Sequence, residues 1–223
     1  MLFTKRLVFA CLALSHALLT GLRAAETPAT RPNILIILAD DLGYWDLGFQ
    51  GCSDIPTPHL DALARGGVRC TSGYVSSSMC SPSRAGLLTG RSQSRFGHEI
   101  NWKPLPGTEH CGLPLAEKTL ADQLKAAGYR TGIVGKWHLG ESPQFHPNRR
   151  GFEEFFGFVG GGHNYFCETY TKSKNGYVSL LERNGQTEKT TGYLTSVLGR
   201  EAASFIRRHK TEPWFLYAAF NAP

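Results

Sequence analysis

The strongest constraint on the fold is an unbroken apolar stretch, residues 34–39 (ILIILA), that runs directly into two aspartates. A strand with one face in water alternates apolar and polar residues, whereas the strands of a parallel sheet covered by helices are apolar throughout. We therefore expect residues 34–39 to form a strand that is buried on both faces. This expectation favours folds built on a parallel sheet.

Helix signals alternate with further apolar strand segments along the rest of the chain. Residues 57–67 (TPHLDALARGG) begin with a threonine and a proline and end with glycines, which is the usual punctuation of a helix. Residues 117–138 predict a helix followed by a strand, and residues 194–210 and 213–220 repeat that order. This alternation predicts an α/β fold in which helices sandwich a mainly parallel sheet.

Composition excludes several classes of protein. The chain has 223 residues, of which 41% are hydrophobic, so it is long and apolar enough to bury a core. Its formal net charge is only +6, and the basic residues are scattered rather than gathered in one stripe. We therefore expect no nucleic-acid partner.

Residues 1–25 have the pattern of an export signal. Lys5 and Arg6 precede a short apolar stretch, residues 7–19, and small residues follow at Ala24 and Ala25. A membrane anchor would need about 20 apolar residues, which is longer than this stretch. We expect an exported protein, periplasmic or secreted, that has no membrane attachment after the signal is cleaved.

The cysteine count is odd once the signal is removed. The five that remain are Cys52, Cys70, Cys80, Cys111 and Cys167. Export permits disulfides, but five cysteines leave either one free thiol or one cysteine with another task. If the four other than Cys80 all pair, three connectivities are possible, and the sequence does not choose between them or exclude reduced thiols.

Charged residues follow two of the expected strands. Asp40 and Asp41 end the first, and Lys136 and His138 end a later one, sharing a face if the chain stays extended there. Two adjacent carboxylates held in one pocket call for a hard divalent cation. The alternative is that Asp41 is a turn residue and that Asp40 only solvates the strand end.

Residues 79–91 (MCSPSRAGLLTGR) combine a cysteine, a proline and an arginine at an expected helix start. The free amides and the dipole of a helix N-terminus attract anions. Cys80 and Arg84 are four residues apart, which places them on one face if the helix begins at once, and a guanidinium suits tetrahedral oxyanions. The alternative is a small buried cysteine at a helix cap beside a surface arginine.

These segments resemble the type I, formylglycine-dependent sulfatases of the alkaline phosphatase superfamily. Residues 80–91 (CSPSRAGLLTGR) are similar to the family signature, residues 32–48 to its metal-binding turn, and residues 128–140 to its lysine-x-histidine segment. In that family a formylglycine-generating enzyme oxidises the signature cysteine to Cα-formylglycine. The resemblance implies the same conversion of Cys80.

The resemblance also assigns roles. It implies that Asp40, Asp41 and the formylglycine made from Cys80 bind Ca²⁺. It further implies a catalytic set of Cys80, Arg84, Lys136 and His138, in which the arginine stabilises the formylglycine hydrate and the last two contact the sulfate. The expected reaction is hydrolysis of an aryl or carbohydrate sulfate ester, so the expected partner is a sulfated small molecule or polysaccharide. Alternatives are a phosphodiester or phosphonate monoester hydrolase, or a non-catalytic remnant.

Family members are generally longer and carry further metal ligands later in the chain. We therefore expect residues 26–223 to be the N-terminal part of a sulfatase catalytic domain, with a fold that is incomplete at its C-terminus.

Weaker site candidates are His163 and Asn164 in a glycine-rich segment that resembles a surface loop. For His98 and Trp102, ordinary loop packing is favoured over a place at the mouth of the cleft.

Overall fold

The computed structural model describes residues 31–102, 106–108, 110–167 and 180–223, of which residues 33–223 form one compact unit. The expected signal sequence, residues 1–25, lies outside the described residues. No helix in the described part of the chain is long and apolar enough to span a bilayer.

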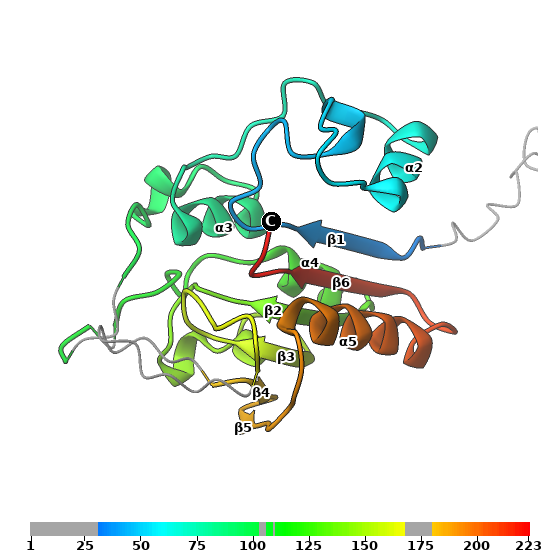
Figure 1. Cartoon of the computed structure of the whole chain (residues 1–223). Helices are drawn as coiled ribbons and strands as arrows, with labels where there is room; N and C mark the ends of the chain where they lie inside the picture. The colour runs from blue at the N-terminus through cyan, green and yellow to red at the C-terminus, as the bar shows by residue number, and fades with distance from the viewer. Residues whose placement is uncertain (1–30, 103–105, 109, 168–179) are drawn as a thin grey trace, which may run out of the picture. The chain divides into compact units, whose positions relative to one another are not determined.

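Within the described residues, six strands form one sheet (Figure 1). In spatial order they are β1 (Ile34–Leu38), β6 (Trp214–Ala219), β2 (Arg130–Lys136), β3 (Glu154–Phe158), β4 (Glu182–Arg183) and β5 (Gln186–Thr187). The first four run parallel, and β4 and β5 continue the sheet antiparallel. The predicted α/β class with a mainly parallel sheet is confirmed.

Helices form where the sequence signals place them. The α-helices are α2 (Pro58–Gly66), α3 (Cys80–Thr89), α4 (Leu120–Ala126) and α5 (Leu194–Arg208). Short 3-10 helices are η1 (Gly48–Gln50), η2 (Gln93–Phe96), η3 (Pro143–Phe145) and η4 (Pro147–Arg149). The helices predicted within residues 57–67, 117–138 and 194–210 are therefore confirmed.

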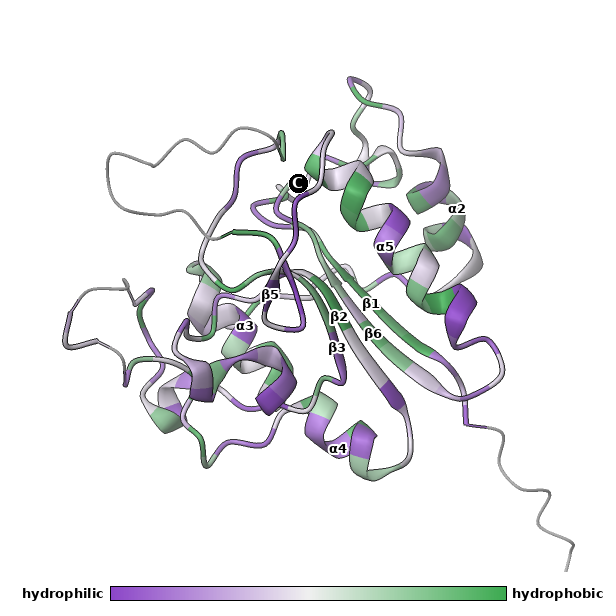
Figure 2. Ribbon diagram, turned by 90° about the horizontal axis from the view of Figure 1, so that it is seen from below, coloured by the Kyte–Doolittle hydropathy of each residue, from purple (hydrophilic) through white to green (hydrophobic). Residues whose placement is uncertain are grey.

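The two faces of the sheet carry separate hydrophobic cores, as strand alternation requires. On one face, residues of α3 and α4 such as Leu88 and Ala121 pack with Ile133 of β2. On the other, Val197 of α5 packs with the next residue of β2, Val134. Helices therefore cover both faces, with α3 and α4 on one side and α5 on the other (Figure 2).

The expectation that the first strand is buried on both faces is wrong for β1. Leu35 and Ile37 are 42% and 50% exposed, whereas Ile34 and Ile36 pack against the α3 side of the core. The reason is the strand order, because β1 lies at the edge of the sheet and α5 packs over β6, β2 and β3 instead. The apolar run therefore predicts the strand correctly, but it does not predict whether a helix covers the second face of that strand.

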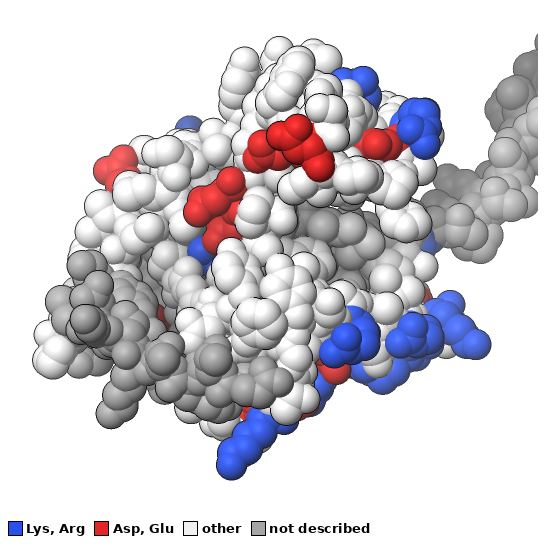
Figure 3. Space-filling model, viewed as in Figure 1, with Lys and Arg blue, Asp and Glu red and all other residues white. Residues whose placement is uncertain are grey.

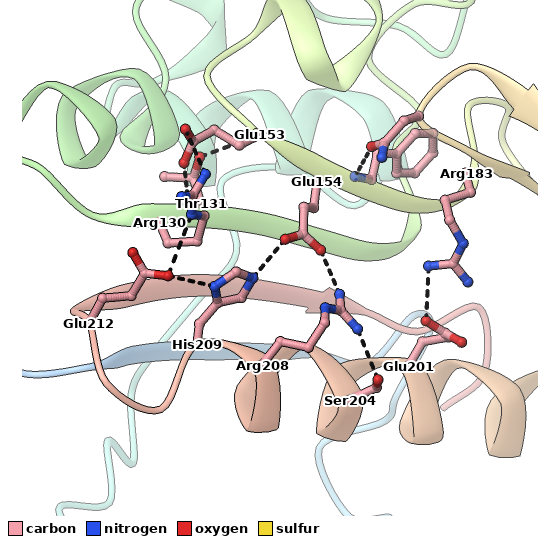
Figure 4. Close-up of polar contacts among 12 residues, drawn as sticks. Arg130, Thr131, Glu153, Glu154, Arg183, Glu201, Ser204, Arg208, His209 and Glu212 are labelled. Carbon is pink, nitrogen blue, oxygen red and sulfur yellow. Dashed lines mark hydrogen bonds and ion pairs between the residues drawn. The ribbon is translucent and has the colours of Figure 1, made fainter.

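Ion pairs fix the last turn of α5 to the start of β3 (Figure 4). His209 lies between two carboxylates, with Nε2 2.6 Å from Glu154 and Nδ1 2.7 Å from Glu212. Arg208 contacts the second oxygen of Glu154 at 2.5 Å. The basic end of α5, which complements the helix dipole, therefore also anchors the helix.

The exposed basic residues of α5 and its end are Arg200, Arg207, Arg208 and Lys210. Basic side chains gather over α5 on the face seen in Figure 3. α5 runs antiparallel to β6, the strand that follows it (Figure 1). Its basic last turn therefore lies beside the amino ends of the parallel strands, whereas Asp40 follows the carboxyl end of β1. This basic surface is therefore separate from the residues that the sequence predicts for the site.

Candidate active site

Three elements bring the predicted site residues to the edge of the sheet where the parallel strands end. Asp40 and Asp41 follow β1, Lys136 is the last residue of β2, and α3 begins at Cys80 (Figure 1). One possible ligand atom from each of Asp40, Asp41 and Cys80 lies within 4.8 Å of the others. The structure thus brings Cys80 to two aspartates that lie 40 and 39 positions earlier in the chain.

A buried network of ion pairs links the aspartate to the two basic residues. Nη2 of Arg84 lies 3.3 Å from Oδ1 of Asp40, and the ammonium of Lys136 contacts Oδ2 of the same carboxylate. Both basic side chains are only 2% exposed. A burial this deep requires a partner for each charge, and Asp40 serves both.

Arg84 has further contacts that fix its orientation. Its Nη1 donates to the main-chain oxygen of Lys136 at 2.9 Å and to the hydroxyl of Tyr217 at 3.3 Å. Tyr217 belongs to β6 and is fully buried, which raises the pKa of its phenol. No pattern in the sequence identifies Tyr217, because its apolar neighbours indicate only a core strand.

His138 lies beside this network in a conformation that the sequence does not predict. Its φ is +57°, so the chain is not extended from Lys136 to His138 as assumed. The strand ends at Lys136, and the main-chain N–H of His138 donates to the oxygen of Val159 at 3.0 Å. The shared position of the two side chains therefore results from this turn and not from strand alternation.

The electrostatic surroundings keep the imidazole of His138 neutral. Burial lowers its pKa to about 3, and the positive charges of Lys136 and Arg84 act in the same direction. Its Nδ1 is buried and has no hydrogen-bond partner in the described part of the chain, and the same is true of Nε of Arg84. Orphaned buried polar atoms at one site indicate a missing polar partner.

Two residues from a neighbouring segment hold the start of α3. The first-turn amide of Ser81 donates to Oδ1 of Asn101 at 2.9 Å, because Met79 at the N-cap position offers no side-chain cap. The Ser81 hydroxyl lies 2.6 Å from Nε2 of His98, whose Nδ1 faces the main-chain oxygen of Gly112 at 3.2 Å. A carbonyl only accepts, so Nδ1 carries the proton and Ser81 donates to Nε2.

His98 is therefore more than the loop residue that the sequence favours. It is 2% exposed, burial lowers its pKa, and its bond to Ser81 fixes the residue next to Cys80. Trp102, the other residue considered for the mouth of the cleft, is 38% exposed. No pattern in the sequence singles out Asn101 as a residue that supports the site.

The donor atoms at this edge of the sheet can be compared with the needs of a metal ion. Calcium prefers oxygen ligands, and the carboxylates of Asp40 and Asp41 supply them. The Sγ of Cys80 is a soft donor and does not suit a hard cation. An oxygen-bearing side chain at position 80 would make the three donors uniform, so the residues fit calcium better with Cys80 oxidised.

The glycine-rich segment passes directly over His138. A Cβ built on Gly161 would lie 2.7 Å from Nε2 of His138, so the glycine permits the close approach. The oxygen of His163 accepts from Nδ2 of Asn221 at 2.9 Å, which ties the segment to the residues after β6. The weaker candidates His163 and Asn164 therefore lie on a segment beside the site.

The structure also shows unpaired cysteines, which differ in burial. Cys52, Cys70, Cys80 and Cys111 are free thiols in the structure, and Cys111 is buried. Of the alternatives left open by the sequence, reduced thiols are therefore the arrangement seen at Cys52, Cys70 and Cys111.

Comparisons with known proteins agree on one family. Residues 32–223 match the family model described as Sulfatase. Arylsulfatase A of Bos taurus is 51% identical over 92% of this chain and 43% of its own length. N-acetylgalactosamine-6-sulfatase of Mus musculus is 38% identical over 96% of this chain and 44% of its own length.

Solved structures give the same result. Ps i-CgsB, also solved with k-i-k-neocarrahexaose, superposes with a TM-score of 0.80 at 45% identity over 86% of this chain and 45% of that one. BT4656 in complex with D-glucosamine-2-N,6-O-disulfate superposes with a TM-score of 0.69 at 27% identity over 86% of this chain and 35% of that one. The chain thus spans less than half the length of these relatives.

Proposed function

Because this chain belongs to the sulfatase family, we propose that it hydrolyses a sulfate ester, using a formylglycine made from Cys80 and a calcium ion. The observation that carries the proposal is the meeting of Cys80, two adjacent aspartates and two buried cations at one edge of the sheet. No structural role requires this combination, since a helix cap and a strand end could be built from neutral residues.

Arg84 and Lys136 bind and orient the sulfate group in this proposal. Their side chains are buried beside the start of α3, where a low dielectric strengthens their attraction for anionic oxygens. The orphaned Nε of Arg84 is a donor without a partner in the described residues. An anionic ester would supply the acceptor that this atom lacks.

Asp40 and Asp41 would hold the calcium ion together with the oxidised side chain at position 80. A bound ion there would supply charge withdrawal from the sulfate oxygens, which lowers the barrier to attack at sulfur. Asp40 has a second task, because it also fixes the ammonium of Lys136 and the guanidinium of Arg84. Asp41, which is exposed, makes no ion pair in the described part of the chain and is free for the ion alone.

The oxidised Cys80, once hydrated, would supply two hydroxyls on one carbon. One would attack sulfur and displace the alcohol of the ester, and deprotonation of the other would let sulfate leave as the aldehyde re-forms. His138 would assist this deprotonation from its position beside Lys136 and Arg84, and its lowered pKa leaves the imidazole neutral at ordinary pH. The Ser81–His98 bond and the Asn101 cap hold the backbone at position 80.

The substrate is proposed to be a sulfated saccharide or aryl sulfate. Support comes from the relatives, which include an N-acetylgalactosamine-6-sulfatase, and from the structural neighbour solved with a glucosamine disulfate. We also propose that the protein is exported and that a formylglycine-generating enzyme oxidises Cys80.

The test is sulfate release by the chain co-expressed with a formylglycine-generating enzyme, supplied with calcium. The panel contains p-nitrocatechol sulfate, glucosamine 6-sulfate and an aryl phosphodiester, and a Cys80→Ala variant is the matched control. We expect sulfate release that the variant lacks. Equal release by the variant, or hydrolysis of the phosphodiester alone, would contradict the proposal.

A further inference from the structure

Three exposed aromatic side chains gather near the proposed site. The rings of Tyr165 and Tyr193 stack with centroids 6.2 Å apart and an angle of 29° between their planes. Phe166 contacts Tyr193 at 5.9 Å. The side chains of Tyr165 and Tyr193 are each 44% exposed, and that of Phe166 is 58% exposed. We refer to these three residues as the aromatic cluster.

Main-chain bonds hold the aromatic cluster against the start of α5. The N–H of Leu194 donates to the oxygen of Tyr165 at 2.7 Å, and Phe166 forms an isolated antiparallel bridge with Tyr193. Tyr193 is the residue before α5, and the far end of that helix is anchored by the ion pairs of His209. The rings therefore stand on a fixed part of the fold.

The aromatic cluster lies on the same edge of the sheet as the proposed catalytic residues. Gly161 packs against the ring of His138, and Tyr165 follows four residues later, which spans at most about 14 Å of extended chain. The start of α5 lies beside the carboxyl ends of the parallel strands (Figure 1). An extended ligand whose sulfate lies beside His138 can therefore reach the cluster.

The chemistry of the aromatic cluster matches a sugar ring. Aromatic rings offer broad, rigid apolar faces, and a tyrosine adds a polar tip that prefers a hydrogen-bond partner. Neither Tyr165 nor Tyr193 uses its hydroxyl in a hydrogen bond within the described part of the chain. A pyranose has an apolar C–H face and a rim of hydroxyls, and so complements both features.

From this geometry we propose that the aromatic cluster is a saccharide subsite, in which a sugar unit next to the sulfated one stacks on Tyr165 and Tyr193. The inference rests on the proposed function and narrows its substrate to a sulfated oligosaccharide or polysaccharide. The competing explanation is that the rings only fasten residues 164–167 to α5.

A binding experiment separates these explanations without requiring catalysis. The probe is a hexasaccharide prepared from desulfated carrageenan, titrated into the full chain by isothermal calorimetry. Tyr165→Ala and Tyr193→Ala should each weaken binding about tenfold, because each removes a stacked face. Tyr165→Phe and Tyr193→Phe keep the ring and should change the Kd by no more than about threefold, the contribution of one hydroxyl.

Leu63→Ala is the matched control, because Leu63 is a 67% exposed apolar side chain on α2, and its removal should leave the Kd unchanged. Thermal unfolding of every variant identifies any that fail to fold, and the phenylalanine variants then carry the test. Absence of hexasaccharide binding by the wild-type chain, or a Kd that both alanine variants leave unchanged, would overturn the subsite.

A second measurement distinguishes failure of the subsite proposal from failure of the proposed function. Turnover of p-nitrocatechol sulfate by the wild-type chain, measured on the same preparation, reports on the proposed reaction alone. Tyrosine-dependent binding of the desulfated probe supports the subsite whether or not that ester is hydrolysed. Hydrolysis of the ester without tyrosine-dependent binding supports the reaction and refutes the subsite.

Discussion

Replacing Asp40 by asparagine should destabilise the protein far more than the same change at Asp41. The two oxygens of Asp40 face different cations, Arg84 and Lys136, and both cations are 2% exposed. Asparagine has one acceptor oxygen, so its NH₂ group must face one of those cations. The variant thus loses the only acidic partner of two buried charges in the described part of the chain.

The magnitude follows from the burial of the network. Breaking a buried ion pair by removing one partner costs about 3–5 kcal/mol. The Asp40 side chain is 14% exposed and one hydrogen bond remains possible, so we expect a loss of about 3 kcal/mol in the free energy of unfolding. For a domain of this size, that corresponds to a decrease of roughly 6–12 °C in Tm.

Asp41→Asn provides the control. Asp41 is exposed, and its φ of +57° is one that asparagine adopts readily, so this variant should unfold within about 0.5 kcal/mol of the wild-type chain. The assay is thermal unfolding followed by circular dichroism in excess chelator, so that loss of metal binding does not contribute. Equal Tm values for the two variants would refute the account of the network.

Three further outcomes follow from the structure. Gly135→Ala should lower the free energy of unfolding by several kcal/mol, because φ of Gly135 is +109° and a Cβ would lie 1.9 Å from the oxygen of Ala219. Urea unfolding measures this loss, and a variant as stable as the wild-type chain would contradict the prediction. The free energy of unfolding should fall as pH drops from about 6.5 toward 3, because in this range only the unfolded state protonates His138. The decrease should be at most about 1.4 kcal/mol per pH unit. A free energy of unfolding that stays constant from pH 7 to 5 would refute this prediction. Asn101→Ala should lower stability by about 1 kcal/mol in urea unfolding by uncapping Ser81, whereas Asn101→Asp should retain the cap.

The sequence predicts the elements of this fold better than their surroundings. Apolar runs and cap residues locate the helices and strands, and the meeting of Asp40 with Lys136 follows from parallel strands ending at one edge. The exposure of Leu35 could not be predicted, because it depends on which strand lies at the edge. Burial on both faces is a property of the assembled layers and not of the strand.

The supporting residues of the site were harder to predict for a similar reason. The bond between Ser81 and His98 and the contact of Arg84 with Tyr217 each join segments that only the folded chain brings together. A histidine or tyrosine among apolar neighbours has no periodic signal that distinguishes a site support from a core residue. The turn at His138 was also missed, because a positive φ at a non-glycine residue leaves no pattern in the sequence.

The most direct test of the central claim is mass spectrometry of the peptide that contains Cys80, from protein purified from its own host and treated with a hydrazide. The account predicts a hydrazone at position 80, which reports the aldehyde of formylglycine. Cys70 is an exposed thiol of the same chain and should stay unmodified, so its peptide is the internal control. An unmodified thiol at Cys80 would contradict the proposed chemistry.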